Sequence, residues 1–109
     1  MPLLRGNLHA HTTFSDGIRS PATLVAEYER LGYDFLAITD HEDLVPPDYW
    51  RALGDLAPGL LLFHGIELNY PRVPQHLGKV VGDREALHVL NHPARYKLSL
   101  EETVARIAM

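Results

Sequence analysis

Apolar residues along this chain fall into short runs that suit buried strands and longer amphipathic segments that suit helices. Turn-forming residues separate these segments. Strands are predicted at Leu3–His11, Phe35–Thr39, Leu60–Phe63 (continuing towards Glu67), Leu77–Val81 and Leu87–Leu90. In the first strand, Asn7, His9 and His11 share one face, because successive side chains on a strand point to opposite sides.

Three helices are predicted between and after these strands. The first begins at Ser20, a typical N-cap followed by proline, and stops at Gly32. The second follows a pair of prolines and is predicted to bury Tyr49 and Trp50, and the last follows a capping box that starts at Ser99. This alternation predicts an α/β fold with a mostly parallel sheet or part of a barrel.

Composition narrows the class of protein. The chain has 109 residues, of which 46% are apolar and 22% charged, as expected for one small globular domain. There is no cysteine, no apolar run of membrane-spanning length and no signal peptide, so we expect a cytoplasmic protein without a membrane segment. The net charge of −4 and the lack of a basic run disfavour binding to long nucleic acids.

Histidine and carboxylate residues stand where the predicted strands end, and the chain has seven histidines in all. These residues are His9, His11, Asp40, His41, Glu67 and His92. The carboxyl ends of parallel strands are where α/β proteins build their sites. Histidine, aspartate and glutamate are the common ligands of zinc, manganese and iron, so the pattern indicates a metal centre.

The His9-x-His11 pair has the geometry of a metal-binding element. Residues two apart on a strand have Cβ atoms about 6–7 Å apart, so both imidazoles can reach one ion at about 2.0–2.1 Å. Asp16 follows in a loop long enough to fold back over the pair. The pair alone also suits two half-exposed strand histidines, whereas the whole string Asn-Leu-His-Ala-His-Thr-Thr-Phe-Ser-Asp-Gly, residues 7–17, is more specific.

That string resembles the first motif of the PHP (polymerase and histidinol phosphatase) family. Four later strings resemble the family's other motifs, in the same order. They are Ile38-Thr39-Asp40-His41, Gly65-Ile66-Glu67, Gln75-His76-Leu77-Gly78 and Leu90-Asn91-His92-Pro93. The resemblance covers roughly residues 3 to 100. It implies a (β/α)7 barrel that holds two or three divalent ions, of zinc, manganese or iron, at the carboxyl end of its strands.

The resemblance also implies a role for each residue. Asp40 would contact a ligand instead of a metal, orienting an imidazole or a water on the metal. Glu67 would bridge two ions. The implied ligand sets are His9, His11 and Glu67 for one ion, Glu67, His76 and His92 for the second, and Asp16 and His41 for the third.

The sequence departs from the family pattern after His92, where the family's final Asp-x-His motif is missing. Five predicted strands also cannot close a seven-stranded barrel. We therefore expect residues 1–109 to form a single PHP-like domain that is incomplete at its C-terminus, a partial or shortened (β/α)7 barrel. Its open sheet edges would favour pairing between copies of the chain, so a homo-oligomer is expected.

These observations predict a metal-dependent hydrolase of phosphoesters that uses an activated water. The net negative charge of the chain favours a small phosphomonoester or nucleotide as substrate over a long nucleic acid. Two alternatives remain at this point. One is a non-catalytic or regulatory PHP-like module, or an inactive fragment, because the final motif is missing. The other is an amidohydrolase-type enzyme that cleaves C–N bonds, since such enzymes also begin with His-x-His on a first barrel strand.

Four further residues were considered for the site. Arg19 and Arg95 each follow a predicted ligand by three residues and could bind a substrate phosphate, although a plain surface role fits each as well. His64 and His88 lie within apolar strands and are predicted to be structural. His88 is the alternative ligand if His76 does not bind.

Overall fold

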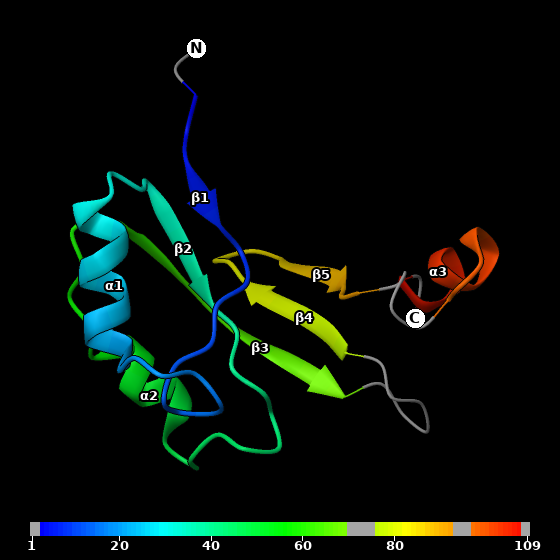
Figure 1. The fold of residues 1–109 in the computed structure, drawn as a ribbon, viewed down its shortest axis with the longest axis horizontal. Coiled ribbons are helices and arrows are strands. Elements are labelled where there is room, and N and C mark those ends of the chain that lie inside the picture. Colours follow the sequence, from blue (N-terminus) through cyan, green and yellow to red (C-terminus); the bar gives the residue numbers. More distant parts are fainter. Residues whose placement is uncertain (1–2, 70–75, 93–96, 108–109) are drawn as a thin grey trace.

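Residues 3–69, 76–92 and 97–107, which the computed structural model describes, form a curled five-stranded sheet with helices beside it (Figure 1). Across the sheet the strands follow in the order β1-β2-β3-β4-β5. They are β1 (Gly6–Asn7), β2 (Phe35–Ile38), β3 (Leu61–Asn69), β4 (His76–Val81) and β5 (Ala86–Leu90). The helices are α1 (Pro21–Arg30), α2 (Tyr49–Gly54) and α3 (Leu100–Ile107). None of these helices is long and apolar enough to cross a membrane.

The first three strands are parallel, and each connection between them carries a helix. β1 pairs with β2, and β2 with β3, in parallel. Helix α1 begins as predicted, since the side chain of Ser20 accepts a hydrogen bond from the backbone N–H of Thr23. The chain leaves α1 through Gly32, whose φ of 79° lies in the left-handed region that favours glycine. This half of the sheet has the predicted α/β arrangement.

The other half of the sheet is antiparallel, which differs from the mostly parallel sheet predicted. β3 pairs with β4, and β4 with β5, in antiparallel register. Only residues 82–85 connect β4 to β5, whereas a parallel connection needs about a dozen residues or more. The result is a mixed α/β half-barrel, consistent with a partial barrel.

The first predicted strand, Leu3–His11, is mostly irregular, because only Gly6–Asn7 pairs with β2 as a strand. Beyond Asn7 the chain is attached to β2 by other bonds. The backbone N–H of Ala10 donates to the hydroxyl of Thr39, and the N–H of Thr39 donates to the carbonyl of Ala10. A side chain thus replaces part of the strand ladder just where the metal-binding pair begins.

The buried core lies between the sheet and helices α1 and α2. It is formed by Ala10, Val25, Leu36, Ile38, Tyr49, Leu53, Leu60 and Ile66. Tyr49 is only 1% exposed, whereas Trp50 is 44% exposed, so the prediction that both are buried is wrong for Trp50. Neighbouring residues on a helix point about 100° apart, and the short helix α2 meets the core along one narrow face.

The opposite face of the sheet carries apolar side chains that no helix covers in the described part of the chain. We call it the open face and define it by Phe35, Leu61, Phe63, Val80 and Leu87. These residues line a hollow of about 410 Å³. Leu61 and Leu87 are exposed, although both are large apolar residues. An exposed apolar face of this kind is typical of a surface that another polypeptide covers.

We expect the isolated 109-residue chain to self-associate or to unfold readily, because the open face exposes large apolar side chains and the outer strand β5 pairs with β4 alone among the described residues. Light scattering on the purified chain, combined with thermal melting, measures both properties. A monodisperse monomer that melts cooperatively well above room temperature would contradict this expectation.

Candidate metal centre

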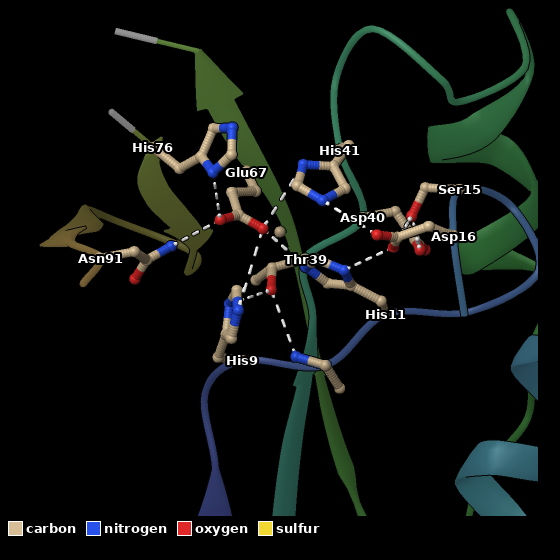
Figure 2. A network of polar contacts seen from close by, with 12 residues as sticks. His9, His11, Ser15, Asp16, Thr39, Asp40, His41, Glu67, His76 and Asn91 are labelled. Carbon is tan, nitrogen blue, oxygen red and sulfur yellow. Dashed lines mark hydrogen bonds and ion pairs between the residues drawn. The ribbon is translucent and has the colours of Figure 1, made fainter. Parts of the chain in front are cut away.

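Every residue that the sequence predicts as a metal ligand lies in one continuous cluster at one edge of the sheet. Figure 2 shows this cluster and labels all of these residues except His92. The cluster contains three adjoining groups, and within each group the possible ligand atoms lie within 4.8 Å of one another. The groups are His9, Glu67 and His92; His11, Asp16 and His41; and His41, Glu67 and His76. Glu67 and His41 each belong to two groups, so the three groups are linked.

Strand direction explains how both halves of the sheet contribute to this edge. Glu67 lies near the carboxyl end of β3. Because β4 runs antiparallel to β3, its first residue, His76, lies at the same edge. β5 reverses again and ends there, and His92 follows its last residue by two positions. The edge therefore collects ligands from the carboxyl ends of β2, β3 and β5 and from the start of β4.

Glu67 is the centre of the cluster. Its side chain is 1% exposed and is surrounded by imidazole rings. Its Oε2 lies 2.6 Å from His11 Nε2, 3.7 Å from His41 Nδ1 and 3.8 Å from His9 Nε2. Its Oε1 lies 3.3 Å from His76 Nδ1 and accepts a hydrogen bond from Asn91 Nδ2 at 3.2 Å. A buried carboxylate needs positive charge around it. Metal ions bound jointly by Glu67 and the four surrounding imidazoles would supply that charge.

The backbone fixes His41 beside Glu67. The N–H of Glu67 donates to the carbonyl of Asp40, and the N–H of Glu42 donates to the carbonyl of Glu67. These two hydrogen bonds, on either side of His41, pair His41 with Glu67 in a parallel β-bridge. The rings of His41 and His76 lie edge to face with centroids 5.0 Å apart. The ligands of this group are therefore placed by main-chain pairing as well as by side-chain packing.

His11 lies between two carboxylates, one on each ring nitrogen. Its Nδ1 is 2.7 Å from Asp16 Oδ1, and its Nε2 is 2.6 Å from Glu67 Oε2. A neutral imidazole has only one N–H and can donate to only one carboxylate. The second contact therefore needs either another proton or a metal cation, and the donor set of imidazoles and carboxylates fits a divalent metal.

Electrostatics keeps two of the ligand residues in their metal-binding forms. Burial lowers the pKa of His9 by more than the negative charge of Glu67 raises it, so the ring favours its neutral form. Partial desolvation works against ionisation of Asp16, but the hydrogen bond to His11 and the nearby His41 outweigh it and lower the pKa of Asp16. Neutral imidazole and ionised carboxylate are the forms that bind metals.

Asp40 is fully buried, and it holds the loop that carries Asp16. One carboxylate oxygen accepts hydrogen bonds from the N–H of Thr12 at 2.6 Å and the hydroxyl of Ser15 at 2.5 Å. The other accepts from the hydroxyl of Thr12 at 2.8 Å. Asp40 thus holds Thr12 and Ser15 in the loop that carries Asp16, whereas the resemblance implies that it orients an imidazole or a water on the metal.

Among the described residues, two pairs that the resemblance assigns to a shared ion fall in separate groups: His9 and His11, and His76 and His92. His76 and His92 were expected to share an ion with Glu67, but among the described residues each forms a separate group with Glu67, one with His41 and the other with His9. His92 is exposed, and its φ of 52° lies in the left-handed region, which is uncommon for a residue with a side chain. The rings of His9 and His92 lie 6.1 Å apart.

Of the remaining residues that the sequence analysis considers, the structure describes Arg19, His64 and His88. Arg19 is exposed and lies close enough to α1 to lower the pKa of Glu27, after the larger effect of Arg30. Arg95 falls outside the described residues. Among the residues described, His64 and His88 belong to none of the ligand groups, and His88 is exposed on β5.

Two residues that contact the ligands were missed by sequence reasoning. Asn91 donates to Glu67, and the hydroxyl of Thr39 contacts His9. Both stand beside a predicted site residue within a motif string, next to His92 and Asp40 respectively. Position in the motif was the available signal, but it did not say which ligand each would touch.

Comparison with known proteins is consistent with this geometry. The crystal structures that resemble the chain include a candidate metal-dependent phosphoesterase from Bifidobacterium adolescentis and a two-domain protein from Bacteroides vulgatus that contains a predicted PHP-like metal-dependent phosphoesterase. The first is 32% identical with a TM-score of 0.54, over 73% of this chain and 29% of that one. The second is 26% identical with a TM-score of 0.53, over 71% of this chain and 26% of that one.

Among curated proteins, the 5′-3′ exoribonuclease Rnm of Salmonella typhimurium is 28% identical, over 94% of this chain and 34% of its own length. The chain thus spans about a third of that relative. The sequence profile of the PHP domain family matches residues 7–102, which include all seven clustered ligand residues. The chain therefore belongs to the PHP domain family.

Proposed function

We propose that this metal centre hydrolyses phosphoesters, and that its substrate is a small phosphomonoester or a nucleotide. The observation that carries the proposal is the buried carboxylate of Glu67 with four imidazoles around it, within three linked ligand groups. The metal-dependent phosphoesterases among the similar structures support the same reaction class. We further propose two or three divalent ions, of zinc, manganese or iron.

The chemistry divides between the ions and the protein. Divalent ions at such a site activate water as a nucleophile and neutralise charge on phosphoryl oxygens. The protein supplies imidazoles and carboxylates in fixed positions. The side chains of Asp16 and His9 are 55% and 39% exposed, so a phosphate group could reach these two ligand residues from solvent.

A second candidate substrate is the 5′ end of an RNA, because the relative from Salmonella typhimurium is named as a 5′-3′ exoribonuclease. The net charge of −4 and the absence of a basic run favour the small substrate, since binding along a nucleic acid depends on basic side chains. Phosphate released from nucleoside monophosphates, compared with nucleotide released from a 5′-phosphorylated oligoribonucleotide, separates the two substrates.

The test of the proposed function begins with protein purified without chelator. We expect elemental analysis to find bound divalent metal and phosphate release to stop with chelator and resume when metal is restored. Metal-loaded protein that hydrolyses none of the phosphoesters would refute the proposal and favour a non-catalytic module or inactive fragment. Cleavage of a C–N substrate by such protein would instead favour the amidohydrolase alternative.

Acidification is expected to release the metal and stop hydrolysis. Protons compete with metal for histidine below about pH 6.5, the usual histidine pKa. The pKa values of His9 and Asp16 lie below their usual values, so both groups resist protonation and the midpoint of release should lie below that pH. Metal content measured after equilibration from pH 8 to pH 4 checks this. Full retention of metal at pH 4 would count against a histidine-rich centre.

A further inference from the structure

Thr39 belongs to none of the ligand groups, yet it contacts one of the ligands directly. It follows the last residue of β2 and is fully buried. Its hydroxyl oxygen lies 2.9 Å from Nδ1 of His9 and also accepts a hydrogen bond from the N–H of Ala10 at 3.2 Å (Figure 2). The hydroxyl is thus shared between the ring of His9 and the backbone beside it.

The direction of this hydroxyl is set by the packing of the rest of the side chain. A Cβ added to Gly65 on β3 would lie 2.7 Å from the methyl carbon of Thr39, closer than side-chain carbons approach one another. The methyl group therefore rests over Gly65 and occupies the space left by the missing side chain. With the methyl fixed there, the hydroxyl faces His9 and Ala10.

The ring of His9 consequently presents only one nitrogen to the cluster. Nδ1 is held by Thr39, while Nε2 faces Oε2 of Glu67 at 3.8 Å. For Nε2 to bind a metal through its lone pair, the single proton of the neutral ring must be on Nδ1. An N–H at Nδ1 then donates to the hydroxyl oxygen of Thr39, which has a second lone pair for Ala10.

We propose that Thr39 is a positioning residue that fixes the tautomer and orientation of His9. Its hydroxyl accepts a hydrogen bond from Nδ1–H and so presents the lone pair of Nε2 to a metal ion shared with Glu67. The inference rests on the metal-binding part of the proposed function and does not depend on which bond is hydrolysed. Hydrogen bonds to the second nitrogen of a ligand histidine commonly change metal affinity by about 10–100-fold.

The experiment compares zinc-loaded wild-type protein with Thr39→Val, Thr39→Ser and Thr12→Val. Valine keeps the shape over Gly65 but removes the acceptor, whereas serine keeps the acceptor. Thr12→Val is the control for the state of the His9 ring only, because it also removes a fully buried hydroxyl in the same region, one that donates to Asp40 and not to His9. Its zinc affinity is not compared, since Thr12 helps to hold the loop that carries Asp16. Nitrogen-15 NMR of the imidazoles reports which nitrogen of His9 binds zinc, and hydrogen exchange reports whether its N–H is protected. Competition with a chelator measures zinc affinity.

We expect zinc on Nε2 and a protected Nδ1–H in wild-type protein, in Thr39→Ser and in Thr12→Val. In Thr39→Val we expect the protection to be lost and zinc affinity to fall about 10–100-fold. Zinc bound through Nδ1, or unchanged affinity and protection in Thr39→Val, would overturn the inference. If Thr39→Val does not fold, the wild-type spectrum still decides which nitrogen binds.

The experiment can refute the role of Thr39 without refuting the proposed function, and the reverse. A chain with zinc on Nε2 and a protected Nδ1–H that hydrolyses no phosphoester would refute the function and leave the role of Thr39 intact. A chain that hydrolyses phosphoesters with His9 bound through Nδ1 would refute only the role of Thr39. A chain that binds none of zinc, manganese and iron would refute both.

Discussion

Glu67→Gln will lower the affinity for divalent metal by at least about 100-fold, more than the loss of a hydrogen bond around a ligand. Glu67 belongs to two of the three ligand groups, and its carboxylate lies within 4 Å of four imidazoles. An amide has no charge to offset the repulsion between neighbouring cations, and only its carbonyl oxygen can coordinate a metal. Elemental analysis and competition with a chelator measure the loss.

Two variants control for the substitution itself. Glu85→Gln makes the same change at an exposed position in the turn between β4 and β5. His64→Gln changes a histidine on the same strand, three residues from Glu67 and hence on the other face of the sheet. Both should keep their metal. Equal loss from Glu67→Gln and either control would show that the variants fail for a general reason, and the assigned centre would be wrong.

Tyr49→Phe will destabilise the protein by about 2–4 kcal/mol, because it leaves two buried backbone groups without their partner. The hydroxyl of Tyr49 donates to the carbonyl of Gly65 at 2.7 Å and accepts from the N–H of Asp40 at 3.2 Å. It therefore links the carboxyl end of β2 to β3 directly beneath the ligand cluster. Burial raises the pKa of Tyr49 well above its usual value, so the hydroxyl keeps the proton that it donates. Urea denaturation of the metal-free protein measures the change.

Tyr28→Phe is the matched control for this prediction. The hydroxyl of Tyr28 accepts one hydrogen bond, from the side-chain amide of Asn7, at a partly buried position where water can replace it. Its loss should cost less than about 1 kcal/mol. If the two variants were equally stable, the link made by Tyr49 between β2 and β3 would not be a major source of stability.

The ligand residues could be predicted from sequence because the motif strings name them, whereas strand direction could not be inferred from the same apolar patterns. An apolar run such as Leu77–Val81 looks the same in either direction. The connection decides the direction, and residues 82–85 are too few for a parallel crossover. His76 was identified correctly as a residue near the site, although it begins its strand instead of ending one.

The contacts of single hydroxyl groups could not be predicted from the sequence, for a different reason. Periodicity places Tyr49 on a buried helix face, which is confirmed, but it does not say that the hydroxyl reaches Gly65 on β3. The same periodicity could not exclude Trp50, because a helix this short repeats its pattern too few times. The partition of His76 and His92 between two groups depends likewise on how β4 and β5 turn back at the sheet edge.

The sheet topology has a consequence for the order in which the protein folds. The meander β3-β4-β5 joins neighbours in the chain, whereas the contact of His11 with Glu67 closes a separation of 56 residues. Local pairings form faster than distant ones, so we expect Glu67 and His76 to be in place before His9 and His11 arrive. Contacts that form after the rate-limiting step change the unfolding rate more than the folding rate. A metal ion that binds His9 or His11 together with Glu67 should therefore slow unfolding much more than it speeds folding. The folded chain would then live longer with metal bound, although it would form no faster.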